Sequence, residues 1–136
     1  MARRVYFAFD YQDVFEVNQI RRSAQFDDVS VRGFTDASQW ETLQKKDDAT
    51  IKRAIDEALI GTSVTVVCIG ERTASRPYVK YELNASADRG NGLLGVYLPG
   101  TSGYAQPTEL RGAPVCNWDS SRFADWVETA ARLAGR

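Results

Sequence analysis

The sequence places a tyrosine and a glutamate four residues apart in the stretch RPYVKYELNAS, residues 76–86. If this stretch is helical, Tyr78 and Glu82 lie on one side of the helix, because residues at i and i+4 are neighbours. An aromatic ring beside a carboxylate suits a ribose or a base, since the ring stacks and the carboxylate accepts hydrogen bonds from hydroxyl groups. A helical glutamate is more often solvated, and a tyrosine more often packs than stacks on a ligand, so both interpretations stay open here.

The composition excludes several other catalytic chemistries. The chain contains no histidine, which removes the Ser-His-Asp and Cys-His arrangements and the commonest zinc ligand. Two cysteines far apart in sequence cannot form a closed zinc site, so we expect no metal. Cys68 lies in the apolar run SVTVVCIG and is expected to be a buried thiol, with a disulfide to Cys116 as the alternative. Neither GxGxxG nor a P-loop is present, so no tightly bound cofactor is expected.

Length and charge predict one domain over residues 1–136. Seventeen basic and eighteen acidic residues give a net charge of -1, so we expect no nucleic-acid partner. No run approaches the roughly 18 apolar residues of a membrane-spanning helix, so no membrane contact is expected. The start, MARRVYFAF, lacks the apolar stretch of a signal peptide, and a cytoplasmic location is the simplest expectation.

Strand-like and helix-like segments alternate along the chain. The β-prone apolar runs are residues 5–9, 29–31, 63–69, 93–98 and 115–118. Apolar residues recur at helical spacing in the segments 14–24, 51–59, 77–89 and 123–133. This order predicts an α/β fold with a mostly parallel sheet of about five strands and helices on both faces. At this size the flavodoxin-like strand order 2-1-3-4-5 is expected.

Side chains suited to helix capping precede these helices. Asp47 or Asp48 is expected to cap the second helix, and Ser120 or Ser121 the last one. Asp10 and Asp13 precede the first helix, where a capping role and a carboxylate pair remain equal alternatives. In the last helix we expect one packed face, made of Phe123, Trp126, Val127, Ala130 and Leu133.

In such a sheet, ligands bind beyond the carboxyl ends of the strands, at the switch point between strands 1 and 3. Glu82 lies about 9 Å along the helix that follows the third strand, so it is the best-placed carboxylate. The loop 33–40 contributes further candidates, although turn formation and packing are the alternative roles there. The candidate substrate-binding residues are Phe9, Asp10, Tyr11, Asp36, Ser38, Trp40, Gly70, Arg72 and Tyr78.

Several of these segments, in this order, resemble a TIR-like domain, most closely the TIR-like component of the bacterial Thoeris antiviral systems. The resemblance covers residues 3 to about 98 and rests on VYFAFDYQD, GFTDASQW, IKRAIDEALIGTSVTVVCIG, RPYVKYEL and GNGLLGVYL. Many TIR domains consume NAD with a catalytic glutamate in the pattern W-C-x-x-E. Here Tyr78 stands in place of the tryptophan and Val79 in place of the cysteine, while Glu82 is kept. The resemblance thus implies a flavodoxin-like fold and Glu82 as the catalytic residue.

The resemblance also implies a function and partners. NAD would be the substrate, cleaved at the nicotinamide glycosidic bond to give a cyclic or conjugated ADP-ribose product. That product would be a messenger that activates a separate effector protein, after a phage component triggers the enzyme. Self-assembly is a further expectation. Two alternatives stay open: a non-catalytic TIR-like interaction module, and a nucleoside deoxyribosyltransferase-like enzyme, which also uses a glutamate near a ribose.

Overall fold

Five parallel strands form one sheet in the computed structural model, which describes residues 3–23, 29–32, 42–43 and 45–136. The strands are β1 (Arg3–Ala8), β2 (Val29–Arg32), β3 (Val64–Ile69), β4 (Gly92–Tyr97) and β5 (Val115–Asn117). Their spatial order is β2-β1-β3-β4-β5, and every neighbouring pair is parallel. The predicted α/β fold and its 2-1-3-4-5 order are confirmed.

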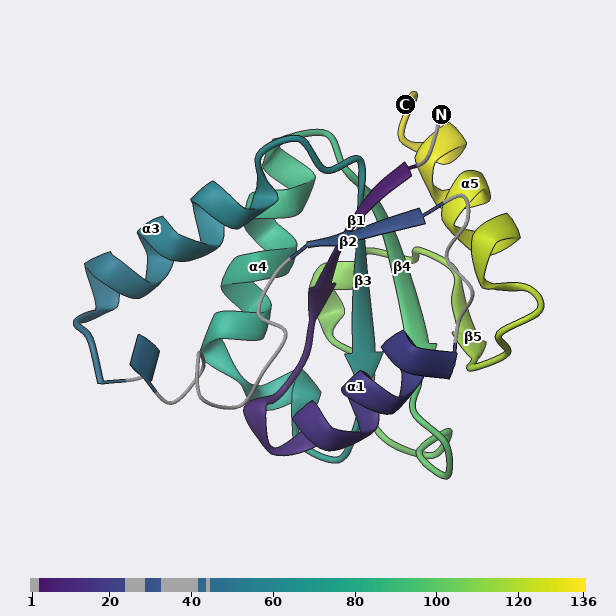
Figure 1. Cartoon of the computed structure of the whole chain (residues 1–136), viewed down its shortest axis with the longest axis horizontal. Helices are drawn as coiled ribbons and strands as arrows, with labels where there is room; N and C mark the ends of the chain where they lie inside the picture. The colour runs from purple at the N-terminus through teal and green to yellow at the C-terminus, as the bar shows by residue number, and fades with distance from the viewer. Residues whose placement is uncertain (1–2, 24–28, 33–41, 44) are drawn as a thin grey trace.

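Helices cover both faces of this sheet (Figure 1). The α-helices are α1 (Val14–Ser23), α3 (Asp48–Leu59), α4 (Pro77–Asp88) and α5 (Phe123–Leu133). Short 3-10 turns are η1 (Tyr11–Asp13), η2 (Thr73–Ser75) and η3 (Thr108–Leu110). In Figure 1, α3 and α4 lie to one side of the strands, and the yellow α5 lies to the other. Within the described ranges no helix is both long and apolar enough to cross a membrane.

Alternation along β1 divides its side chains between two buried clusters. Val5 and Phe7 pack in the cluster that contains the α1 and α5 residues, whereas Tyr6 and Ala8 pack with those of α3 and α4. Successive side chains of a strand point to opposite faces, so this division follows from the period of two. Tyr6 is therefore buried on the face of the sheet that α4 covers.

The helix ends test the capping predictions. Asp47 caps α3, because its Oδ1 accepts a hydrogen bond of 2.8 Å from the backbone N–H of Thr50. The serine prediction for α5 is wrong: Arg122 occupies the N-cap position and no side chain caps this end. The Ser121 hydroxyl instead donates to Asp119 at 2.7 Å, as is typical of polar side chains that close a turn.

The face of α5 against the sheet is narrower than expected. Phe123, Val127, Ala130 and Ala131 are buried, but Leu133 is 72% exposed. Successive residues of an α-helix are rotated by about 100°, so Leu133 lies roughly 100° around α5 from the centre of this buried face. The prediction that Leu133 belongs to the packed face is therefore wrong. The buried face of α5 lies very close to the sheet: a Cβ on Gly92 of β4 would lie 2.3 Å from the carbonyl oxygen of Ala130.

A buried group of polar side chains holds the C-terminal half of α4. The hydroxyl of Ser86 lies 2.7 Å from that of Thr65 on β3, and it donates a 2.6 Å hydrogen bond to the carbonyl oxygen of Glu82. The amide of Asn91 donates to Thr62 at 2.9 Å. Buried polar groups need such partners, so these bonds fix the register of α4 on the sheet.

Candidate functional site

A pocket of about 530 Å³ lies where the carboxyl end of β1 faces the start of α4. Its volume is in the range of small-molecule sites. Four predicted substrate-binding residues, Phe9, Asp10, Tyr11 and Tyr78, line it together. The full lining is Phe9, Asp10, Tyr11, Gln12, Lys46, Ile51, Arg76, Pro77, Tyr78 and Val79.

The local sequence explains why these residues meet. β1 ends at Ala8, and the chain turns through η1 at Tyr11 instead of extending the sheet. α4 begins with Pro77, whose missing N–H costs nothing in the first turn of a helix. Since β1 and β3 are parallel neighbours, the residues after β1 and the helix that follows β3 come to the same edge of the sheet.

An ion pair joins the two sides of the pocket. Nε of Arg76, at the N-cap position of α4, lies 3.0 Å from Oδ1 of Asp10, whose side chain is only 6% exposed. Asp10 makes no capping hydrogen bond to η1, so the capping role considered for it is wrong. The arginine compensates a carboxylate that burial would otherwise destabilise.

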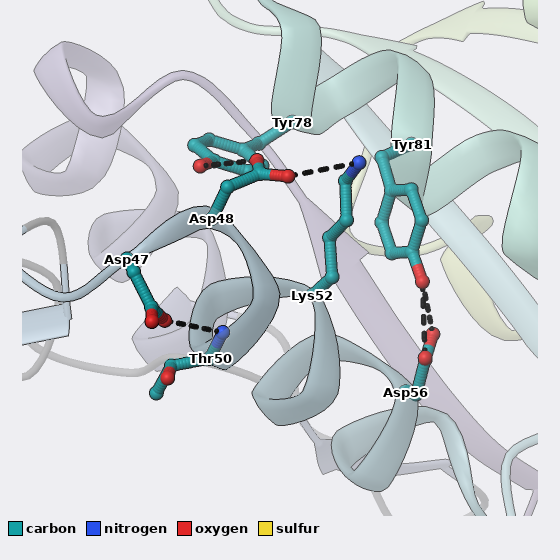
Figure 2. Close-up of polar contacts among 7 residues, drawn as sticks. All are labelled: Asp47, Asp48, Thr50, Lys52, Asp56, Tyr78 and Tyr81. Atoms are coloured by element: carbon teal, nitrogen blue, oxygen red, sulfur yellow. Dashed lines mark hydrogen bonds and ion pairs between the residues drawn. The ribbon is translucent and has the colours of Figure 1, made fainter.

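Tyr78 lines the pocket while its hydroxyl is engaged by α3 (Figure 2). That hydroxyl donates to Oδ1 of Asp48 at 2.9 Å, and Nζ of Lys52 lies 3.1 Å from the other oxygen of Asp48. One turn further along α4, Tyr81 donates to Asp56 at 2.8 Å. Figure 2 shows that these contacts form a row between α3 and α4. They fix the position of the Tyr78 ring relative to both helices.

Glu82 is buried in the core on α4. Only 1% of it is exposed, and the hydroxyl of Tyr6 donates a hydrogen bond to its Oε2. Oε1 has no hydrogen-bond partner within the part of the chain that the structure describes. Burial raises the pKa of Glu82 to about 8, and the bond from Tyr6 acts in the opposite direction. The carboxyl group therefore mostly holds a proton at neutral pH in this arrangement.

Glu82 lies one turn of α4 beyond the pocket and is not among its lining residues. It follows Tyr78 by four residues and Val79 by three, and both of these line the pocket. Helical side chains lean toward the N-terminus of their helix, which is the pocket end of α4. On the same face of β1, the residue between Tyr6 and the pocket is the small Ala8.

Comparison with known proteins places the chain in a family. Residues 6–103 match the family described as "Thoeris protein ThsB, TIR-like domain". The chain belongs to this family. It is also 43% identical, over 101 residues, to a protein of Bacillus cereus (strain MSX-D12) that carries the provisional name cyclic ADP-D-ribose synthase ThsB1. That match covers 72% of this chain and 53% of the relative, so the chain spans about half the length of the curated relative it matches.

Two other predicted substrate-binding residues of this ThsB-family chain, Arg72 and Gly70, are not part of the pocket lining. Arg72 is exposed and donates to Gln12 at 3.0 Å, which places it beside the pocket and outside its lining. Gly70 is buried, and its N–H donates to the hydroxyl of Thr73 at 2.8 Å. Three further candidates lie outside the described residues: Asp36, Ser38 and Trp40.

The carboxyl group of Asp13 packs against the backbone of Gly70. A Cβ on Gly70 would lie 2.2 Å from Oδ2 of Asp13, so a larger residue at position 70 would require the Asp13 side chain to move. Burial, and then the charges of Asp10, Glu16 and Glu71, raise the pKa of Asp13 to about 6. Among the described residues, no group of acidic or cysteine side chains could hold a metal ion, and Cys68 and Cys116 are free thiols.

Sequence reasoning missed three residues that the structure makes important. Arg76 is not among the predicted site residues, because only the fold shows that it lies opposite Asp10. Lys46 lines the pocket, but its sequence context, KKDDAT, carries no signal for this. Tyr6 was assigned to an apolar strand, and only the fold reveals that its hydroxyl reaches Glu82.

Proposed function

We propose that this chain cleaves NAD at the bond between nicotinamide and ribose and forms an ADP-ribose-derived signalling molecule, with Glu82 as the catalytic residue. The observation that carries the proposal is the position of Glu82, one turn of α4 from a pocket walled by Tyr78 and by Phe9 and Tyr11. The provisional name of the 43% identical relative, cyclic ADP-D-ribose synthase, supports the same chemistry.

The reaction needs one carboxylate. When the glycosidic bond breaks, its electron pair moves to the ring nitrogen of nicotinamide, which leaves as a neutral molecule and needs no proton. Positive charge develops on the ribose, and an ionised Glu82 stabilises it while accepting hydrogen bonds from the ribose hydroxyls. Attack by water gives ADP-ribose and a proton, whereas attack by an atom of the same molecule gives a cyclic isomer.

Binding of NAD would favour the ionised form of Glu82 that the reaction needs. Burial raises its pKa to about 8, so without a ligand it mostly carries a proton. The nicotinamide ring of NAD carries a positive charge, and an opposite charge a few ångströms away favours the ionised form. Binding of NAD would thus lower the pKa of the residue that acts on it, and Lys46 in the pocket wall offers a positive charge for the pyrophosphate.

The family supports a place for this reaction in a signalling sequence. A phage component would trigger the enzyme, the product would diffuse to a separate effector protein, and self-assembly would accompany activation. Exclusion of water from an assembled site would favour cyclisation over hydrolysis.

The direct test is to incubate the protein with NAD, with and without lysate of phage-infected cells, and to measure nicotinamide release by chromatography. We expect Glu82→Gln to lower the triggered rate at least about 100-fold. The matched control is Glu57→Gln, because Glu57 is exposed on α3 and lines no part of the pocket. Equal rates for Glu82→Gln and wild type would overturn the assignment. Deoxynucleoside cleavage without NAD cleavage would indicate a deoxyribosyltransferase instead.

One observation favours a second candidate, a non-catalytic interaction module. Glu82 is 1% exposed and does not line the pocket. This candidate predicts no NAD turnover under any trigger, and phage protection in cells that survives Glu82→Gln. If Glu82→Gln loses both phage protection and nicotinamide release, the chain acts as an enzyme and not as an interaction module.

A further inference from the structure

The strongest unexplained feature is a tyrosine hydroxyl placed in the core. Tyr6 is fully buried in the middle of β1, where phenylalanine would fill the same space without a polar group. A buried hydroxyl without a partner is costly, so its presence is explained by what it bonds. Among the described residues, the hydroxyl donates to Oε2 of Glu82, which is 76 positions away in the sequence.

We propose that Tyr6 is a positioning residue for Glu82, anchoring Oε2 so that Oε1 stays available for a ribose hydroxyl of the substrate. The inference rests on the proposed function for its catalytic meaning. Its physical content, that Tyr6 controls the orientation and ionisation of the Glu82 carboxyl group, is independent of any activity.

The two carboxylate oxygens of Glu82 have different contacts. Oε2 accepts the hydrogen bond from Tyr6, while Oε1 is buried and has no partner among the described residues. The backbone of Glu82 is held separately, since Ser86 donates to its carbonyl oxygen at 2.6 Å. Once Glu82 is ionised, both of its oxygens can accept hydrogen bonds, so Oε1 is free to accept one from the substrate. A ribose hydroxyl that enters past Ala8 would supply it.

Among the residues that the structure describes, Tyr6 is the polar side chain that bonds this carboxyl group. The charged residues of α3 that approach α4 are Asp48, Lys52 and Asp56, and they contact the outer tyrosines Tyr78 and Tyr81. On the sheet side, α4 meets the neutral hydroxyl of Thr65 and apolar residues of β3. Burial and Tyr6 are the two causes that set the pKa of Glu82, and a hydrogen bond donated to a carboxylate favours its ionised form.

The decisive experiment is a carbon-13 titration of the Glu82 carboxyl carbon in wild type and in Tyr6→Phe. The signal is assigned by its disappearance in Glu82→Gln. We expect the midpoint in Tyr6→Phe to rise by about one unit, a tenfold change in the ionisation constant, which is the effect of losing one charge-assisted hydrogen bond. The matched control is Tyr81→Phe, which removes an exposed tyrosine hydroxyl from the same helix and should leave the midpoint unchanged. An unchanged midpoint in Tyr6→Phe overturns the proposal.

Kinetics then separate positioning from a merely structural role. In triggered NAD cleavage, Tyr6→Phe should lower kcat/KM about tenfold at pH 7, because kcat/KM depends on the ionisation of the free enzyme, and the loss should shrink as pH rises. A loss that is equal at every pH overturns the positioning role. If wild type releases no nicotinamide, the proposed function fails, but the titration still decides whether Tyr6 controls Glu82.

A second measurement covers the case in which Tyr6→Phe does not fold. The ring carbon that bears the hydroxyl of Tyr6 can be labelled in wild type and followed against pH. Its signal should shift with the same midpoint as Glu82 and become independent of pH in Glu82→Gln. No shift at the Glu82 midpoint overturns the proposal.

Discussion

Arg76 and Asp10 form an ion pair of 3.0 Å between the start of α4 and the end of β1, at the wall of the pocket. The Asp10 side chain is almost fully buried, whereas Arg76 is 39% exposed, so the carboxylate depends on the arginine more than the reverse.

Replacement of Arg76 should therefore cost stability and activity together. We expect Arg76→Gln to lower the free energy of unfolding by about 1–3 kcal/mol, because it leaves a buried charge unpaired. Urea denaturation measures this. Arg72→Gln is the control, since Arg72 is exposed and its guanidinium donates to the amide oxygen of Gln12, and a change within about 0.5 kcal/mol is expected. Equal effects of the two substitutions would contradict this role of the pair.

Tyr78 should act through its ring and not through its hydroxyl. Tyr78→Phe loses only the exposed bond to Asp48, so the KM for NAD should stay within about twofold. Tyr78→Leu removes the aromatic face and should raise KM about tenfold, the usual scale of a stacking contact. Steady-state kinetics with triggered enzyme measure both. Tyr81→Leu, on the same helix but outside the pocket lining, is the control, and a KM equal to that of Tyr78→Leu would exclude stacking.

Stability should fall as pH rises through the titration of Glu82. The pKa is raised from 4.5 to about 8 in the folded protein, so the folded state binds more protons than the unfolded state between these values. The contribution of Glu82 to the unfolding free energy is then full below about pH 4.5 and is lost toward pH 8, by an amount on the order of a few kcal/mol. Urea midpoints between pH 6.5 and 8.5 test this, because Asp13, with a pKa of about 6, contributes mainly below that window.

The control for this pH dependence is Glu82→Gln. Its urea midpoint should be nearly flat between pH 6.5 and 8.5, whatever its absolute stability. If the wild type is equally flat, Glu82 does not have a raised pKa in the folded protein.

The α3 cap offers a test of local stability. Asp47→Ala removes the 2.8 Å bond to the N–H of Thr50 and should lower the free energy of unfolding, because the first turn of α3 loses its side-chain cap. Ser121→Ala, at the helix start where no side chain caps, should change it by less than about 0.5 kcal/mol. Thermal or urea unfolding compares them, and a larger loss for Ser121→Ala would refute the assignment of the caps.

The sequence predicted the strand order well because this information is local. The run Val64–Ile69 is apolar except for Thr65, and such a run is typical of a central strand covered on both faces. The alternation of such runs with helical spacing then leaves few topologies for a chain of this size. The ends of α5 were harder, because Ser121 has a competing partner in Asp119 two residues away.

The candidate site was predictable only in part. Phe9, Asp10, Tyr11 and Tyr78 come together because the carboxyl ends of parallel strands share an edge, which is a rule of topology. The burial of Glu82 and its bond to Tyr6 depend on side-chain directions across the interface of β1 and α4. No spacing within either segment encodes that contact, so it could be found only from the fold.

The two halves of α4 are held to the rest of the protein by different kinds of contact. Ser86, Thr65 and Asn91 hold its C-terminal half through buried hydrogen bonds, which are expensive to break. Its N-terminal half is held by Arg76 and Tyr78, through contacts that are partly exposed to solvent. A displacement of α4 would therefore pivot about Ser86 and move its first turns. Glu82, one turn before that pivot, would keep its place on the sheet while the pocket above it widened or narrowed.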